Sequence, residues 1–124
     1  MSLTPRQVAE SYWRAEESRD VEQVLAHFHP DATFHPVTGP LTGHAQIRTF
    51  YDGMGDTYPG LEVRIVHEIS SGDEAALEWE ADLINHEGTR FPICGSNFVK
   101  VRDGKFTYVR AYFDPTSFPQ PGSV

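Results

Sequence analysis

With 124 residues, the chain is long enough to bury a hydrophobic core, and we expect one domain over residues 1–124. Its formal net charge of −8 argues against a nucleic-acid partner, because phosphate binding needs a basic face. No stretch approaches the roughly 18 apolar residues of a membrane span, and the first ten residues lack the apolar run of a signal peptide. The single cysteine, Cys94, excludes an internal disulfide, and we expect a cytoplasmic protein without a membrane partner.

The N-terminal residues predict a helix. Residues 4–7 have the form of a capping box, and Pro5 takes the first helical position, where its missing N–H costs nothing. Val8 and Tyr12 then recur at helical spacing, with Trp13 beside Tyr12. One face of this helix is therefore expected to pack against the core.

Two further helices are predicted before residue 60. Asp20 is typical of a helix cap, and the helix after it is expected to stop at His29-Pro30, because the residue before a proline disfavours helical geometry. A short extended piece around residues 33–35 follows. Ile47 begins the apolar stripe of a third helix, which Gly53 and Gly55 are expected to end.

From residue 61 onward, apolar and polar residues alternate, which indicates antiparallel strands with one wet face. The breaks between strands fall at residues 70–73, 85–88 and 103–104. Helices followed by a strand meander predict an α+β fold, a conical barrel of a curved, mostly antiparallel sheet around the N-terminal helices, with an internal apolar pocket. The Pro-rich residues 115–124 are expected to be an extended or mobile tail.

The hairpin at Asp103-Gly104 decides which face of the sheet carries Asn97. A tight two-residue turn pairs Asn97 with Arg110. A three-residue loop with a bulge instead places Asn97 on the face of Val109 and Ala111. A shift of one residue moves every side chain to the other face, and these residues alone leave both registers open.

Five short motifs occur in an order typical of one group of proteins. They are DVEQV at 20–24, FxxDAT at 28–33, GxxxI at 43–47, DGKF at 103–106 and YFD at 112–114. Together they resemble SnoaL-like and ketosteroid-isomerase-like members of the nuclear transport factor 2-like superfamily, over roughly residues 4–114. The resemblance implies a cone with an apolar pocket for a small hydrophobic molecule, and a homodimer formed through the outer face of the sheet. Because this fold hosts isomerases, cyclases, epoxide hydrolases and noncatalytic binders, it does not select one activity.

The resemblance also implies catalytic positions. Isomerases of this group use a carboxylate base at the end of the first short strand and two donors for an oxyanion. Tyr12 matches the first donor, and the second falls at Asn97, which favours the bulged register. The base position falls at His35 with one deletion and at Pro36 with none; a neutral imidazole with a pKa near ~6.5 is a suitable base.

Each of these residues also has an ordinary structural interpretation. Tyr12 could be a core aromatic, and His35 could be a loop histidine that faces solvent. The residues expected to line the pocket, each of which could equally be core, are Trp13, Phe50, Met54, Trp79, Phe98, Val109, Ala111 and Phe113. We expect no metal, because His27 and His29, two apart on a helix, do not share a face.

The predicted function is cofactor-free general acid–base catalysis by Tyr12, His35 and Asn97 on a small hydrophobic carbonyl compound, by an isomerase, cyclase or related lyase. One alternative is a noncatalytic module of the same fold that binds small molecules or dimerises. A second alternative is an epoxide hydrolase, which would need an acid pair in the cavity, with Asp82 or Asp114 pointing inward.

Overall fold

The computed structural model describes residues 3–114, within which three helices and six strands follow one another. The helices are α1 (Pro5–Ser18), α2 (Val21–Leu25) and α3 (Gly43–Thr57). The strands are β1 (Phe28–His35), β2 (Leu41–Thr42), β3 (Gly60–Ser71), β4 (Glu74–Ile84), β5 (Arg90–Arg102) and β6 (Lys105–Phe113). The tail expected for residues 115–124 lies outside the described residues.

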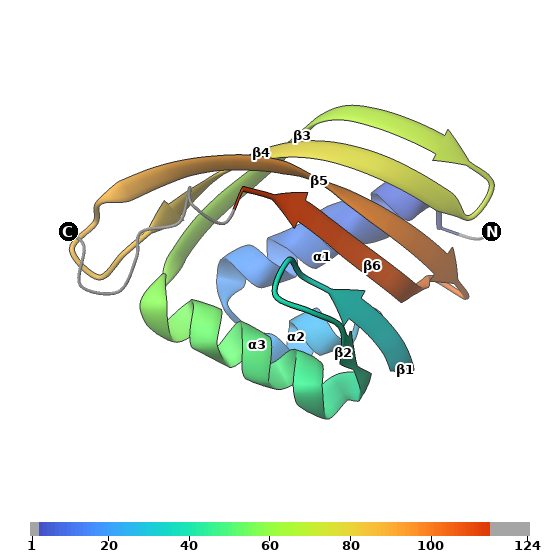
Figure 1. Ribbon diagram of the computed structural model, residues 1–124, viewed down its shortest axis with the longest axis horizontal. Helices are drawn as coiled ribbons and strands as arrows, with labels where there is room; N and C mark the ends of the chain where they lie inside the picture. Colours follow the sequence, from blue (N-terminus) through green and yellow to red (C-terminus); the bar gives the residue numbers. More distant parts are fainter. Residues whose placement is uncertain (1–2, 115–124) are drawn as a thin grey trace.

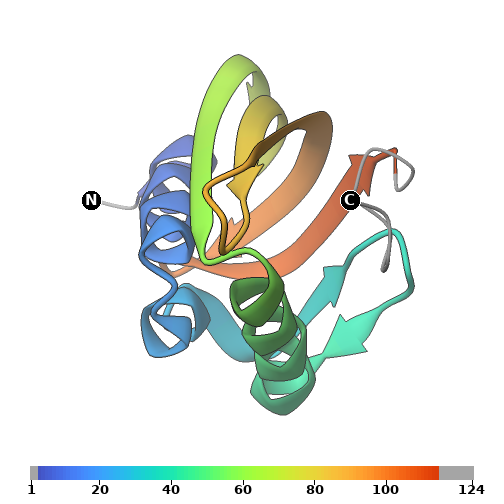
Figure 2. The same cartoon turned by 90° about the vertical axis from the view of Figure 1, so that its left-hand side faces the viewer.

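One curved sheet organises the molecule. Its strand order is β2-β1-β6-β5-β4-β3, in which β1 runs parallel to β6 and the other neighbours are antiparallel. The long strands β3 to β6 arch over the helices, and α1 and α3 lie on the concave side (Figures 1 and 2). The predicted α+β cone is therefore confirmed. No helix of residues 3–114 is long and apolar enough to cross a membrane.

The start of α1 agrees with the capping box expected from the sequence. The Thr4 hydroxyl accepts from the Gln7 backbone N–H, and the Gln7 side chain accepts from the Thr4 N–H. The helix ends at Arg19, which has a left-handed φ of 59°. Val8 and Tyr12 are buried on the face that meets the sheet.

Two predicted helix ends were wrong. The second helix stops at Leu25 rather than continuing to His29-Pro30, because Phe28 already pairs with Phe106 in the sheet, and this pairing prevails over local helix propensity. The third helix does not end at its glycines. Gly53 and Gly55 keep negative φ values inside α3, which runs on to Thr57.

The β5–β6 hairpin combines features of both predicted registers. Asp103 and Gly104 form a tight two-residue turn, with φ values of 54° and 77°. A bulge then leaves Thr107 without a partner in β5, between the pairs Val101↔Phe106 and Lys100↔Tyr108. The bulge restores the alternation, so that Asn97 pairs with Ala111 and faces the concave side.

Candidate active site

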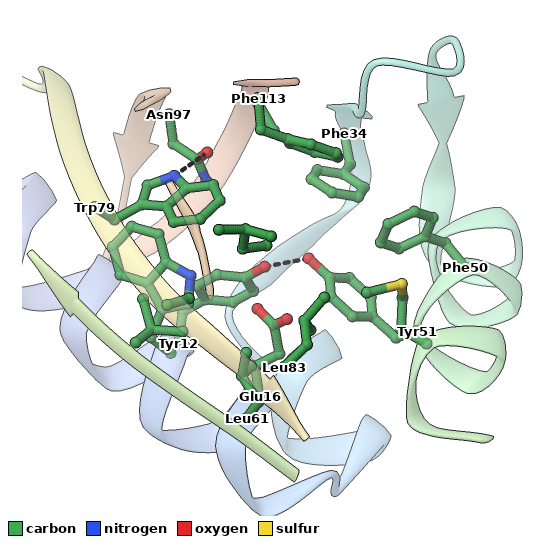
Figure 3. Close-up of a pocket in the computed structure, with 16 residues that line it drawn as sticks. Tyr12, Glu16, Phe34, Phe50, Tyr51, Leu61, Trp79, Leu83, Asn97 and Phe113 are labelled. Atoms are coloured by element: carbon green, nitrogen blue, oxygen red, sulfur yellow. Dashed lines mark hydrogen bonds between the residues drawn. The ribbon is translucent and has the colours of Figure 1, made fainter. Parts of the chain in front are cut away.

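A cavity opens between α1, α3 and the concave face of the sheet. It holds about 550 Å³ of empty space, counting its open mouth. Figure 3 shows its walls, which are largely aromatic and aliphatic. Of the residues predicted for this wall, those that line it are Trp13, Phe50, Met54, Trp79, Ala111 and Phe113. Apolar lining residues that sequence reasoning missed are Phe34, Leu61, Val63, Ala81, Leu83 and Ile93.

Two residues predicted for the wall do not line the cavity. Phe98 is 48% exposed on the outer face, because Asn97 before it points inward and neighbouring strand residues alternate. Its ring packs against Tyr112 instead. Val109 does face inward, but it is fully buried in the core between Phe34 of β1 and Val99 of β5.

His35, the predicted base, also lies outside the cavity. Its neighbour Phe34 points inward and lines the wall, so His35 shares the opposite face with its strand partner Arg110. The His35 ring is bonded through Nδ1 to the Pro36 carbonyl oxygen at 2.9 Å. Pro36, the other aligned position, is buried and has no group that titrates. The base position implied by the resemblance therefore offers the cavity no proton acceptor.

The carboxyl group that does reach the cavity belongs to Glu16, in the last turns of α1. Its side chain is 13% exposed and points up between the hydroxyls of Tyr12 and Tyr51 (Figure 3). Burial raises the pKa of the Glu16 carboxyl, while a hydrogen bond with Tyr12 and the charge of Arg19 oppose this rise. The result is a carboxyl group whose pKa lies closer to neutrality than usual.

Two tyrosines complete the polar end of the cavity. The Tyr12 and Tyr51 hydroxyls are hydrogen-bonded to each other, and both side chains are buried. Burial raises the pKa of both hydroxyls well above the usual value, so both stay protonated and can donate. The chain of groups can then be satisfied with Tyr51 donating to Tyr12 and Tyr12 donating to the Glu16 carboxylate. Phe34 stacks on Tyr51, with ring centroids 5.5 Å apart, and fixes its orientation.

A second polar group enters from the sheet. Asn97 is 5% exposed, and its Oδ1 accepts from the Trp79 Nε1–H at 2.9 Å (Figure 3). This bond fixes the amide and leaves the Nδ2 group as its donor. Trp79 itself packs over Gly95, where a side chain would collide with its ring. The cavity thus carries an acid and two hydroxyls on its helical side, and an amide on its sheet side.

Glu16 was not predicted as a site residue, although its spacing on α1 marks it. Val8, Tyr12 and Glu16 are spaced four residues apart on α1, so they follow one face of the helix. A charged residue on a buried stripe is the exception that indicates a site. The sequence marks Tyr51 less clearly, as a second aromatic residue beside Phe50 on the apolar stripe of α3.

The described part of the chain offers the cavity neither the acid pair that an epoxide hydrolase would need nor a cluster of metal ligands. Asp82 forms an ion pair with Arg90 at 3.2 Å and does not line the cavity, and neither does Asp114. Within residues 3–114, no three side chains among histidine, cysteine, aspartate and glutamate lie close enough to hold a metal ion.

Comparison with known proteins gives a family match for most of the chain. A model described as a SnoaL-like domain matches residues 9–109. Similar solved structures include TerC, co-crystallised with polyporic acid, with 22% identity, a TM-score of 0.78 and coverage of 92% of this chain and 94% of that one. A hypothetical protein with a ketosteroid isomerase-like fold from Catenulispora acidiphila, in complex with trimethylamine, has 18% identity, a TM-score of 0.82 and coverage of 94% and 92%.

An epoxide hydrolase from M. tuberculosis of the LEH-like type has 24% identity and a TM-score of 0.77, with coverage of 91% of this chain and 84% of that one. Comparison of the sequence with curated proteins gives no match. At these identities, the likeness to solved structures shows the fold alone.

Proposed function

The chain belongs to the SnoaL-like family, and we propose that it is a cofactor-free enzyme that transfers protons on a small hydrophobic carbonyl compound. The observation that carries the proposal is Glu16, a carboxyl group with a raised pKa at the polar end of an apolar cavity. A raised pKa brings a carboxyl group closer to the working pH of an enzyme, which favours general acid–base catalysis.

The proposed reaction divides the work between the two sides of the cavity. Glu16 removes a proton from the carbon next to the substrate carbonyl and returns it at a second position. Tyr12 and Tyr51 hold the carboxyl group in place, and this positioning role replaces the oxyanion role predicted for Tyr12. Asn97 donates its Nδ2–H to the developing oxyanion, where exclusion of water makes a fixed donor most effective. Glu16 takes the role predicted for His35.

The cavity wall supports a hydrophobic substrate. Six aromatic side chains from α1, β1, α3, β4 and β6 line it beside Tyr12; they are Trp13, Phe34, Phe50, Tyr51, Trp79 and Phe113. Aromatic walls favour planar or compact apolar ligands through area burial and ring contacts. The co-crystal of TerC with polyporic acid supports a small-molecule occupant at this fold.

A second candidate function is noncatalytic binding of a small organic cation. Aromatic rings around one carboxylate are the usual surroundings of such ligands, because ring faces attract cations. The trimethylamine complex of the Catenulispora acidiphila protein supports this alternative. An epoxide hydrolase is less well supported, since Glu16 is the one carboxyl group that lines this cavity among the described residues.

We also propose that two copies form a homodimer through the outer face of the sheet, as the family resemblance implies. Ile69, Phe98 and Tyr112 expose large apolar surfaces there, at 66%, 48% and 45%. Exposed apolar side chains gathered on one face favour a protein partner. A cytoplasmic location remains part of the proposal, because the free thiol of Cys94 is exposed and suits a reducing compartment.

The experiment that tests the enzyme proposal does not need the natural substrate. Small aryl and alkyl ketones are incubated with the protein in D₂O, and deuterium uptake next to the carbonyl is followed by ¹H NMR. We expect uptake with the wild type, and a loss of about 10²-fold or more in Glu16→Gln. Glu10→Gln, on the exposed face of α1, is the matched control and should keep the wild-type rate. Equal rates in wild type and Glu16→Gln for every ketone would contradict the proposal.

A further inference from the structure

A second cavity lies behind the first, between the end of α1, α2 and α3. It measures about 510 Å³ with its open mouth. Glu16 and Tyr51 line both cavities, so they form the partition between them. The remaining lining residues are Arg19, Val21, Val24, Asp52, Gly55 and Asp56. The Glu16 carboxyl group therefore has a second neighbouring space, on the side away from the apolar cavity.

Arg19 gives this second cavity its polar character. The Arg19 side chain is 15% exposed, and its Nη1 lies 4.0 Å from Glu16 Oε2. Its Nε and Nη2 groups are buried and meet no acceptor in the part of the chain that the structure describes. A buried guanidinium N–H without an acceptor is costly. The geometry therefore points to an acceptor inside this cavity.

Water is a better candidate for this acceptor than an anion is. Glu16, Asp52 and Asp56 surround the cavity with three carboxyl groups against the one positive charge of Arg19. A bound anion would meet this negative surplus, whereas water can accept from Arg19 and donate to a carboxylate at once. The cavity exceeds the space that a water molecule needs.

We propose that the second cavity holds water through which the Glu16 carboxyl group exchanges its proton with solvent, while substrate fills the first cavity. The inference rests on the proposed role of Glu16 in proton transfer. In the exchange step, the Glu16 O–H bond breaks, water in the second cavity accepts the proton, and the ion pair with Arg19 holds the carboxylate left behind. The reverse step reloads the acid without opening the apolar cavity.

The charged and titratable groups around Glu16 are consistent with proton exchange through the second cavity. From α1, Tyr12, Glu17 and Arg19 act on its pKa. From α3, Tyr51 adjoins the carboxyl group, and Asp52 and Asp56 lie at the second cavity. The two aspartates are exposed, so the second cavity borders solvent on their side.

A crystal structure of the full chain that resolves ordered water tests the proposal first. We expect a water molecule within hydrogen-bonding distance of Arg19 Nε or Nη2 that also bonds to the Glu16 carboxylate, directly or through one further water. A dry cavity, a bound anion, or Asp52 or Asp56 swung onto these N–H groups would overturn the proposal.

A pair of glycine variants provides the second test. Gly55→Leu fills the second cavity, because a side chain there meets Arg19 Cδ at ordinary contact distance, 3.8 Å from the added Cβ. Gly53→Leu, two residues earlier in α3, points into open space and is the matched control. With ¹³C-carboxyl-labelled glutamate, NMR should show the Glu16 pKa at least about half a unit higher in Gly55→Leu than in Gly53→Leu.

Identical Glu16 titrations in the two glycine variants would overturn the inference. The crystal structure of Gly55→Leu checks that Arg19 keeps its place beside Glu16, so that loss of water is the change measured. Neither experiment uses a substrate. Failure of the proposed enzyme function, read from deuterium uptake in Glu16→Gln, is therefore separable from failure of this inference.

Discussion

Glu16 is held in an apolar wall by two partners of different kinds, the Tyr12 hydroxyl and the Arg19 guanidinium. Burial favours the neutral carboxyl group, and both partners favour the carboxylate. Arg19 lies 4.0 Å away, so its attraction is that of a loose ion pair, and the hydrogen bond with Tyr12 lowers the Glu16 pKa more than this charge does. The protonation state of Glu16 therefore responds to small changes in either partner.

Removing the Tyr12 hydroxyl tests this balance. In Tyr12→Phe, the pKa of Glu16 should rise further, because the carboxylate loses a donor and burial remains. The free energy of unfolding should fall by about 1 kcal/mol, since the Tyr51 hydroxyl also loses its partner. Carboxyl NMR titration and urea denaturation measure the two effects. Tyr112→Phe, on the exposed outer face, is the control; a Glu16 pKa unchanged in Tyr12→Phe would refute the assigned bond.

The raised pKa of Glu16 also has a consequence for stability. The native state binds the Glu16 proton more tightly than the unfolded state, so native stability falls as pH rises from the ordinary value of 4.5 through the raised one. Relative to Glu16→Gln, which cannot ionise, the wild type should lose up to about 1.4 kcal/mol per pH unit in this window. Thermal or urea unfolding at several pH values measures this difference. Parallel stability curves for the two proteins would show that Glu16 has no raised pKa.

At the scale of residues, the sequence indicated which side chains matter better than it indicated which of them point into the cavity. Tyr12 follows a helical stripe and Asn97 depends on one register, and both line the cavity. His35 was aligned by its position near the end of a strand, but strand alternation gives the inward place to Phe34. Glu16 was missed because a glutamate in a helix is ordinarily exposed, and the sequence alone does not show what covers it.

Among the elements, β5 makes room for a polar contact of the cavity at Gly95. The Gly95 Cα is paired with Trp79 on one side and Phe113 on the other. An added Cβ would lie 2.3 Å from the Tyr112 carbonyl oxygen and 2.8 Å from the Trp79 ring. The missing side chain at Gly95 leaves room for the Trp79 ring, whose Nε1–H donates to Asn97 Oδ1.

Gly95→Ala is therefore expected to destabilise the protein by about 1–3 kcal/mol, as overpacking of a dense core does. Gly53→Ala, in the open part of α3, should instead stabilise it by about 0.5–1 kcal/mol, because glycine is a poor helix former. Urea denaturation distinguishes the two. If Gly95→Ala were as stable as the wild type, the contact between Trp79 and the β5 backbone would be looser than described.

The elements also show where local sequence signals stop being sufficient. The helix cap at Thr4 and the turn at Asp103-Gly104 are local, and both agree with the structure. The bulge at Thr107 has no local signature, because it follows from fitting β6 between β5 and β1. The end of α2 is similar, since pairing of Phe28 with Phe106 decides it from 78 residues away along the chain.

For the whole molecule, the curved sheet separates two apolar surfaces with different expected occupants. The concave face, with the helices, encloses the candidate site, and the convex face exposes Phe98 and Tyr112. We expect the wild type to be a dimer and Phe98→Glu to be a monomer, because two like charges would meet in an apolar contact. Light scattering coupled to gel filtration measures the mass. Val37→Glu, in the loop after β1, is the control, and a monomeric wild type would contradict the proposed dimer.

The account as a whole depends on the claim that Glu16 transfers the proton. The most direct test is the pH dependence of deuterium uptake by a reactive ketone, beside the NMR titration of the Glu16 carboxyl group in the same protein. We predict a rate that rises with pH with its midpoint at the Glu16 pKa, above 4.5, and that is lost in Glu16→Gln. A rate that persists in Glu16→Gln, or whose midpoint differs from that of Glu16, would contradict the account.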